Sequence, residues 1–181
     1  MQTAYELGQS LAENDVELIY GGATVGLMGA VADGALAAGG KVIGVMPSLL
    51  TEKELAHKDL SELIPVQDMH ERKAMMAELA DGFIALPGGC GTMEELFEVW
   101  CWAQLGLHHK PCALYNVDGF YNKLIEFIHH AQSQQFIREE YTRMLVVGNS
   151  PDEILQAFRS YQPPADKWRD RSALKPATQD I

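Results

Sequence analysis

The sequence predicts an α/β fold of the Rossmann-like type, a three-layer α/β/α sandwich built around a mainly parallel sheet. Short apolar runs rich in β-branched residues alternate along the chain with longer stretches of helical periodicity, and this alternation is typical of βαβ units. The runs at 83–86 and 144–147 are apolar almost throughout. Strands that are covered by helices on both faces have this composition, so both runs fit a buried parallel sheet.

The order of the elements follows from the same two patterns. The apolar runs predict strands at 16–20, 41–46, 63–66, 83–86, 112–115 and 144–147. The periodic stretches predict helices at 2–13, 25–38, 70–80, 93–105, 120–135 and 151–161. Gly39 and Gly40 end the second of these helices, and Pro151, which follows Ser150, is suited to the first position of the last.

Length and composition predict one domain followed by a tail. A chain of 181 residues can bury one full core, and we expect a single domain over 1–161. Residues 162–181 are polar, contain scattered prolines and lack a periodic apolar face. They are therefore predicted to form a flexible tail.

The charge balance narrows the range of partners. The chain has 14 basic and 25 acidic residues, a formal net charge of −11 and a pI near 4.9. This is the wrong sign for a polyanion, so we expect no nucleic acid partner. No uncharged run approaches the roughly 18 residues of a membrane span, so we expect no membrane partner either.

The N-terminus and the cysteines indicate a cytoplasmic protein. The first residues lack the basic and apolar segments of a signal peptide, and Cys90, Cys101 and Cys112 show no CxxC spacing. The adjacent pairs at 108–109 and 129–130 are histidines, and sequence neighbours do not share a helix face. We therefore expect reduced thiols and no metal site.

The most informative motif is Pro-Gly-Gly-Cys-Gly-Thr-Met-Glu-Glu at 87–95, between an expected strand and an expected helix. Glycines allow the backbone to approach a ligand closely, and the start of a helix offers unpaired N–H groups to an anion such as phosphate. Glu95 is unexpected there, because a carboxylate competes with an anion for the helix end. Thr92 and Glu95 also have the spacing of a capping box, so both interpretations remain open.

A second glycine cluster lies at 21–29 and also joins a strand to a helix. It does not fit the dinucleotide fingerprint, because Thr24 stands where the second glycine is needed, and no acid follows the next strand at Met46 and Pro47. The stretch 34–41 does not fit a P-loop, since no Ser or Thr follows its lysine. The cluster therefore indicates either close packing of helix on strand or a backbone cradle for a nucleotide.

Two further segments have alternative interpretations. Residues 70–73 begin a helix with charged side chains that either face solvent or, in the case of Arg72, bind a phosphate through the forked guanidinium. The helix at 93–105 is apolar nearly all round after its acidic start. It is buried inside the fold or forms a subunit interface, for which a symmetric dimer is the commonest arrangement.

Together these motifs resemble the LONELY GUY (LOG) family. The resemblance rests on the segments 21–29, 69–73, 86–95, 102–106, 109–111 and 116–121, and covers roughly residues 5–160. It implies a Rossmann-like homodimer without a cofactor that acts as a cytokinin riboside 5′-monophosphate phosphoribohydrolase. Such an enzyme releases a free base and ribose 5-phosphate. Family members were often labelled lysine decarboxylases because of the PGGxGTxxE motif.

The resemblance also implies roles for individual residues. Arg72 and Glu95 match the catalytic Arg and Glu of the family. The matching substrate-binding set is Gly22, Gly26, Glu54, Lys73, Gly88, Gly89, Cys90, Gly91, Thr92, Met93 and Glu94. Cys101 replaces a residue that is usually Thr, and Cys90 occupies the variable position of the motif. Relatives also begin with a strand that ends in a Cys-Gly-Ser turn. This chain starts at the first helix instead, which predicts exposed sheet edges.

A mechanism follows as a hypothesis. The N–H groups of Gly89, Gly91 and Thr92 would hold the 5′-phosphate, while Glu95, and in addition Glu54, would face the ribose. Arg72 would bind the phosphate and favour the ionised form of Glu95, so its loss should lower kcat and raise KM. The alternative is a carrier of a nucleotide or of the molybdenum cofactor that performs no hydrolysis. Lysine decarboxylation would need pyridoxal phosphate, for which the sequence offers no basis.

Overall fold

The computed structural model of the protein describes residues 1–51 and 56–164. The strands are β1 (Leu18–Tyr20), β2 (Val42–Pro47), β3 (Glu62–Val66), β4 (Phe83–Ala85), β5 (Cys112–Tyr115) and β6 (Leu145–Gly148). The helices are α1 (Gln2–Glu13), α2 (Gly26–Ala37), α3 (Ser48–Thr51), α4 (Met69–Leu79), α5 (Cys90–Gln104), α6 (Asn122–Ser133), α7 (Glu139–Thr142) and α8 (Pro151–Arg159), with a 3-10 turn, η1, at Val117–Gly119. None of these helices is long and apolar enough to cross a bilayer.

The predicted alternation of strands and helices is confirmed, and most boundaries move by one or two residues. The larger difference is at α5, which begins at Cys90 rather than at 93. The short elements α3, α7 and η1 were not expected, because segments of three or four residues are too short to show a periodic apolar face. The strand-rich and helix-rich parts of the chain therefore follow the sequence pattern closely.

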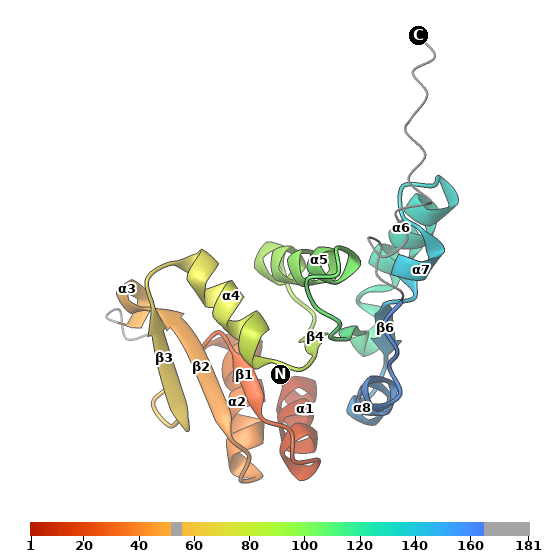
Figure 1. Ribbon diagram of the computed structural model, residues 1–181. Coiled ribbons are helices and arrows are strands. Elements are labelled where there is room, and N and C mark those ends of the chain that lie inside the picture. The colour runs from red at the N-terminus through yellow and green to blue at the C-terminus, as the bar shows by residue number, and fades with distance from the viewer. Residues whose placement is uncertain (52–55, 165–181) are drawn as a thin grey trace.

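The strands form two parallel sheets of three strands each, in the orders β1-β2-β3 and β4-β5-β6. Figure 1 shows β1 and β4, one edge strand from each sheet, on the facing sides of the two sheets. Among the described residues no strand pairs with both, so each of these edges lacks a partner strand. The residues of β1 and β4 are half-buried or buried, however, and not exposed as the sequence predicted. The α/β class is confirmed, with two three-stranded sheets in place of one continuous sheet.

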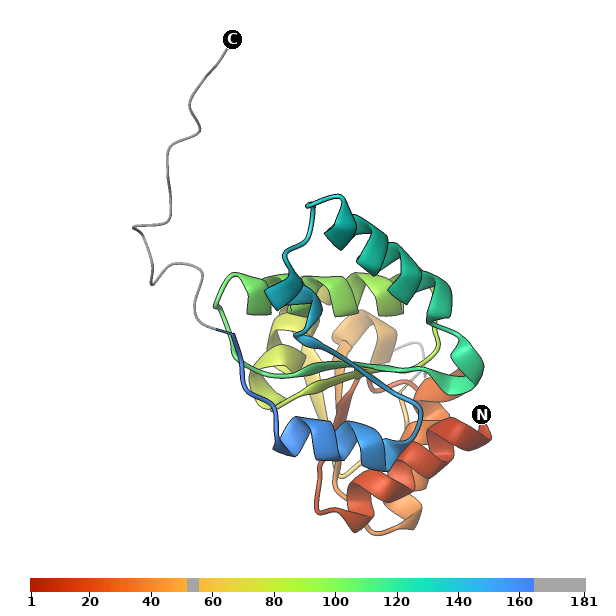
Figure 2. The ribbon, with the colours of Figure 1, turned by 90° about the vertical axis from the view of Figure 1, so that its right-hand side faces the viewer.

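The alternating side chains of β5 show how the three layers form. Cys112 and Leu114 point into a cluster that includes residues of α5 and α6, whereas Ala113 and Tyr115 point into a cluster that includes residues of α1, α2 and α8. Successive side chains of a strand point to opposite faces, so β5 is buried on both sides. Figure 2 shows the result, with α5 and α6 above the strands and α1 and α8 below them.

Glycines bring α1 and α2 into close contact. The Cβ atom of an alanine at position 34 would lie 2.0 Å from the carbonyl oxygen of Tyr5, and one at position 8 would lie 2.1 Å from that of Val31. Both distances are too short for any side chain, so the two helix backbones touch directly. This contact joins α1 to α2, and α1 also packs in one cluster with Ala113 and Tyr115 of β5.

Polar contacts link the two halves of the chain elsewhere. Lys110, in the loop before β5, donates to the carbonyl oxygen of Ala77 in the last turn of α4 at 2.7 Å. On the opposite side, Nη2 of Arg159 in α8 donates to Oδ1 of Asn14 at the end of α1 at 2.7 Å. These contacts fix α4 beside the second sheet and α1 beside α8. The functional site described below lies between α4 and α5.

The predicted tail lies largely outside the described residues. Residues 165–181 make up most of the expected tail at 162–181, and the last described helix ends at Arg159. The single domain over 1–161 therefore stays a prediction.

The glycine contacts generate a stability prediction. Gly34→Ala should destabilise the protein by about 1–3 kcal/mol, because its methyl group overlaps the backbone of α1. The matched control is Gly91→Ala in α5, whose methyl group would meet no other part of the described chain within 4 Å. That variant should gain about 0.4–1 kcal/mol from the lower entropy of its unfolded chain. Urea unfolding measures the change in unfolding free energy for both variants. Equal changes at positions 34 and 91 would contradict the direct contact between the backbones of α1 and α2.

Candidate functional site

The glycine turn between β4 and α5 presents unpaired N–H groups. Gly89 is the N-cap of α5 and has no side chain to cap it, and the N–H of Met93 is the first to bond back, to the carbonyl oxygen of Gly89 at 3.1 Å. The N–H groups of Cys90, Gly91 and Thr92 therefore have no acceptor within the helix. They form a ready site for an anion at the positive end of the helix dipole.

The capping-box interpretation of Thr92 and Glu95 is wrong. Thr92 lies inside the first turn of α5 rather than before it, and its side chain covers Gly88 instead. The Cβ atom of an alanine at position 88 would lie 2.1 Å from Oγ1 of Thr92. Because Gly89 takes the N-cap position, Glu95 is free to bond elsewhere.

The fold itself does not require glycine at positions 89 and 91. Neither residue has a positive φ, and a Cβ atom at either position would meet no other part of the described chain within 4 Å. Both residues are exposed. Open space over N–H groups is what a tightly bound anion needs, so these two glycines are better explained by a ligand than by packing.

Arg72 lies at the centre of the site. Its residue is 8 % exposed, its Nε donates to the carbonyl oxygen of Val45 in β2 at 3.1 Å, and its Nη1 donates to Oε1 of Glu95 at 2.5 Å. The Glu95 side chain is 35 % exposed, so the carboxylate is paired on one side and open to solvent on another. This arrangement holds the acid in place at the edge of the site.

The start of α4 explains how Arg72 is held. Oδ1 of Asp68 accepts from the N–H groups of His70 at 2.8 Å and Glu71 at 2.9 Å. The bond from Glu71, followed by the one from His70, lowers the pKa of Asp68. His70 and Glu71 face solvent as one interpretation of this segment predicted, but Arg72 turns inward. The solvent-facing interpretation therefore holds for His70 and Glu71 but not for Arg72, whose binding of a phosphate stays a prediction.

Lys73 forms a second ionic contact between α4 and α5. Its Nζ is paired with Glu94 and lies 3.0 Å from Oε2 of Glu98. The bond to Glu94 is the largest cause of the raised pKa of Lys73, followed by the bond to Glu98. Lys73 and Glu94 were both expected in the substrate-binding set, and here they bind each other. The structure thus brings Arg72, Lys73, Glu94 and Glu95 together.

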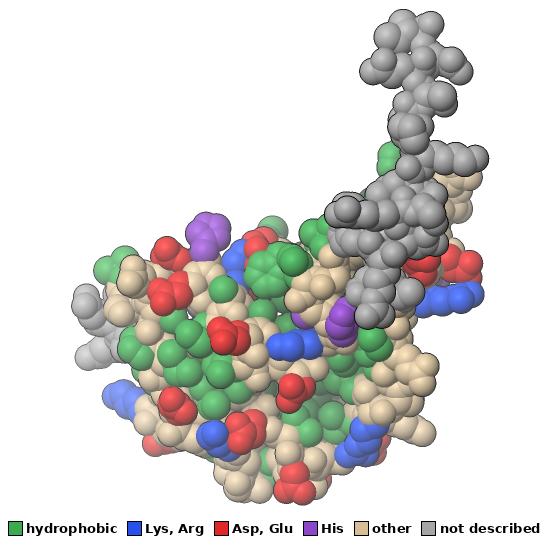
Figure 3. Space-filling view, viewed as in Figure 1, with side chains coloured by type: hydrophobic (Ala, Val, Ile, Leu, Met, Phe, Trp, Pro, Cys, Tyr) green, Lys and Arg blue, Asp and Glu red, His purple; other side chains and the backbone are tan. Residues whose placement is uncertain are grey.

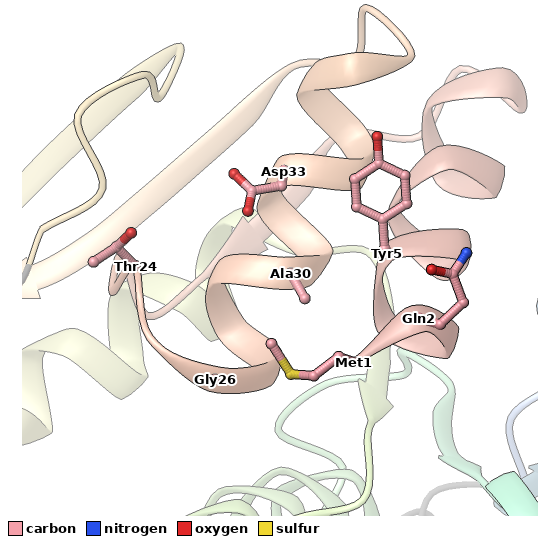
Figure 4. A pocket seen from close by; sticks show the side chains of 7 residues that line it. All are labelled: Met1, Gln2, Tyr5, Thr24, Gly26, Ala30 and Asp33. Atoms are coloured by element: carbon pink, nitrogen blue, oxygen red, sulfur yellow. The ribbon is translucent and has the colours of Figure 1, made fainter.

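The first glycine cluster lies beside a cavity of about 240 Å³ (Figure 4). The cavity is lined by Met1, Gln2, Tyr5, Thr24, Gly26, Ala30 and Asp33. Gly26 has φ +61° and open space above it, whereas an alanine at position 29 would place its Cβ atom 2.1 Å from the carbonyl oxygen of Thr24. The packing interpretation therefore fits Gly29. The positive φ of Gly26 explains its identity as glycine, and the cradle interpretation stays a prediction. Neither Arg72 nor Glu95 lines this cavity.

A buried histidine, His57, is hydrogen-bonded to the first glycine cluster. His57 is buried, its N–H donates to the carbonyl oxygen of Gly22 at 2.9 Å, and its Nδ1 accepts from the N–H of Asp59 at 3.2 Å. Nε2 therefore carries the proton that bonds to Oδ1 of Asp33 at 2.9 Å. Gly22 has φ +78°, which explains its identity as glycine. Neither His57 nor Asp33 belongs to a motif, so the sequence pattern carries no signal for either residue.

The predicted binding residue Glu54, a metal site and the source of positive charge remain to be considered. Glu54 lies outside the described residues. Within the described part of the chain, no group of three or more His, Cys, Asp or Glu side chains is arranged to hold a metal ion. Basic side chains are scattered singly among acidic ones on the face shown in Figure 3. Positive potential for an anion on that face must therefore come from local sources, such as the start of α5.

Tyr121 fixes the chain just before the glycine turn. Its hydroxyl donates to the carbonyl oxygen of Leu86, and its N–H donates to Oδ1 of Asn116 at 2.8 Å. The side chain is fully buried, and burial raises the pKa of Tyr121 to about 12. Since Leu86 is followed directly by Pro87, this bond sets the direction in which the glycine turn leaves β4.

Comparison with known proteins gives consistent relatives. The chain matches the family model described as "Possible lysine decarboxylase" over residues 28–158. It is 47% identical over 164 residues to "Probable cytokinin riboside 5'-monophosphate phosphoribohydrolase LOGL6" of Oryza sativa subsp. japonica, covering 91% of this chain and 66% of that protein. It is 48% identical over 160 residues to "Cytokinin riboside 5'-monophosphate phosphoribohydrolase" of Rhodococcoides fascians, covering 88% of this chain and 81% of that protein.

Solved structures with lower sequence identity show the same fold. The molybdenum cofactor binding protein from Rippkaea orientalis superposes with a TM-score of 0.68 at 24% identity, covering 88% of this chain and 85% of that one. The molybdenum cofactor carrier protein from Chlamydomonas reinhardtii superposes with a TM-score of 0.65 at 22% identity, covering 87% and 84%. At these identities the likeness establishes the fold alone.

The bond from Tyr121 generates a prediction with an internal control. Tyr121→Phe leaves the carbonyl oxygen of Leu86 without this donor and should cost about 0.5–1.5 kcal/mol of unfolding free energy. The hydroxyl of Tyr20 is also buried but has no hydrogen-bond partner in the described structure. Tyr20→Phe should therefore be neutral or stabilising. Urea unfolding measures the free energy of both variants. A larger loss of stability for Tyr20→Phe than for Tyr121→Phe would contradict the stabilising role of the bond to Leu86.

Proposed function

The chain belongs to the LONELY GUY (LOG) family, and from this premise we propose that it hydrolyses the N-glycosidic bond of a nucleoside 5′-monophosphate. Water adds its hydroxyl to C1′ of the ribose and its proton to the departing base, which releases a free base and ribose 5-phosphate. The observation that carries this proposal is the buried Arg72 that holds Glu95 beside the open N–H groups of the glycine turn.

The phosphate would bind at the start of α5. The N–H groups at 90–92 are unpaired within the helix, and Gly89 and Gly91 leave space above them. Anion binding at a helix end is worth about 0.3–1 kcal/mol when exposed and about 2 kcal/mol when partly buried. The larger role of this anchor is orientation, because a substrate held at its phosphate presents its sugar in a fixed place.

Glu95 would act on the sugar. Glycosidic cleavage passes through an oxocarbenium-like state, and a nearby carboxylate stabilises its positive charge and positions or deprotonates the attacking water. Glu95 is partly exposed and lies one and a half turns into the helix whose start would hold the phosphate. The pairing with Arg72 holds this carboxylate in place.

The contacts of Arg72 favour one of its two expected roles. Its Nε is committed to Val45 and its Nη1 to Glu95. A phosphate gripped by the fork of Nε and Nη2 would have to displace the bond from Nε to Val45. We therefore assign Arg72 to holding Glu95 rather than to binding the phosphate.

The relatives' names guide the proposed substrate. A cytokinin riboside 5′-monophosphate such as isopentenyladenosine monophosphate, or AMP, is the proposed substrate, and a cytoplasmic homodimer is the proposed form. The dimer is supported by α5, where Cys101 and Leu105 are exposed on the side away from the buried Trp100. Figure 3 also shows hydrophobic side chains at the surface over α5.

The carrier alternative has less support. Molybdenum cofactor proteins share the fold, but a carrier that performs no hydrolysis has no use for an acid held at the site by a buried cation. Lysine decarboxylation is named only in the description of the family model. No observation on the site favours either alternative.

The proposed reaction is tested by incubating the protein with AMP and with isopentenyladenosine monophosphate, and by measuring free base and ribose 5-phosphate. Release of both products in equal amounts is expected. The corresponding nucleosides should be far poorer substrates, since they lack the anchored phosphate. An absence of products from both nucleotides would refute the proposal.

The role of Glu95 in the reaction is tested by one variant and a matched control. Glu95→Gln should fold and lose roughly 10²–10⁴-fold in kcat, because the amide cannot deprotonate water or stabilise positive charge as an anion does. Glu78→Gln, on the exposed surface of α4, is the control and should keep full activity.

Gly91→Ala should raise KM for the nucleotide by about tenfold or more, since its methyl group occupies the space proposed for the phosphate and would cost at least about 1.4 kcal/mol of binding. Activity toward the nucleoside should stay unchanged. An equal loss with both substrates would show that position 91 does not contact the phosphate.

A further inference from the structure

We propose that Gly21 is a positioning residue, whose missing side chain forms the seat of the Arg72 guanidinium and thereby sets where Glu95 is held. The catalytic consequence rests on the proposed function, while the seat itself is a structural claim. Gly21 follows β1 directly, 51 positions before Arg72 in the chain.

The contact is specific to one side chain. The Cβ atom of an alanine at position 21 would lie 1.9 Å from Nη2, 3.0 Å from Cζ and 3.4 Å from Nε of Arg72. These are the three nearest atoms, and all belong to the same guanidinium. The planar group therefore lies against the backbone of Gly21, where the smallest side chain would displace it.

The backbone gives Gly21 no other reason to be glycine. It is not among the residues with positive φ, so an L-amino acid can adopt its conformation. The neighbouring Gly22 differs, because its φ is +78° and the nearest atoms to a Cβ there belong to the side chains of Leu63 and Met46 at 3.3–3.4 Å. Gly22 is required by the turn, whereas Gly21 is required by Arg72.

Three contacts then fix the guanidinium. Nε is bonded to Val45, Nη1 is bonded to Glu95, and Nη2 rests on Gly21. The residue is 8 % exposed, so the guanidinium is buried where it makes these contacts. A methyl group at position 21 would push it toward Glu95 or away from Val45. A shift of about 1 Å at a catalytic group can cost on the order of 10²-fold in rate.

The test is a double-mutant cycle with Gly21→Ala and Arg72→Lys. Lysine carries a single ammonium group and lacks Nη2, so it leaves the seat empty. Gly21→Ala should lower kcat at least tenfold in the Arg72 protein, with KM for the nucleotide changed less than twofold. In the Arg72→Lys background the same substitution should change kcat less than twofold. Equal losses of kcat in the Arg72 and the Arg72→Lys proteins would overturn the proposal that Gly21 makes room for the guanidinium.

The same four proteins are compared by urea unfolding, which separates this inference from the proposed function. Gly21→Ala should lower the unfolding midpoint with Arg72 present and leave it unchanged with Lys at 72, whether or not the protein hydrolyses nucleotides. If Gly21→Ala alone fails to fold, the double variant should fold. Failure of the double variant as well, where Arg72→Lys folds, would refute the proposal.

Discussion

The buried guanidinium of Arg72 connects four parts of the molecule that are distant in sequence. It originates on α4, bonds to Val45 in β2, lies against the residue after β1 and pairs with Glu95 on α5. A buried cation is tolerated only when it is paired and hydrogen-bonded, so these partners are mutually required. Because α5 packs with the second sheet and β2 belongs to the first, one side chain ties together the two halves that form the site.

The glycines of the two turns serve different physical purposes, although the sequence shows them as similar clusters. Gly88 makes room for the side chain of Thr92, and Gly21 makes room for Arg72. Gly22 supplies a left-handed backbone conformation. A Cβ atom at Gly89 or Gly91 would meet no other residue in the described part of the chain, which leaves space for a ligand. On this account the turn before α5 has two functions, with its N–H groups proposed to hold a phosphate and Glu95 proposed to act on the sugar.

The sequence predicts the elements well and the site only in part. Period and composition locate every main strand and helix, because burial on one or both faces is a local property of the pattern. The start of α5 was misplaced because Thr92 and Glu95 have true capping spacing, while the actual partner of Glu95 lies 23 positions earlier on another helix. The pairing of Lys73 with Glu94 and the contact of Arg72 with Gly21 are likewise tertiary. No local signal reveals them.

The central claim is that Arg72 and Glu95 act as one unit, and a double-mutant cycle on turnover tests it most directly. The rates of Arg72→Met, Glu95→Gln and the double variant would be measured with the preferred nucleotide. Residues that act as a unit are strongly non-additive, so the double variant should be no slower than the slower single variant. Losses that multiply in the double variant would show that the two residues contribute independently, and would contradict the account.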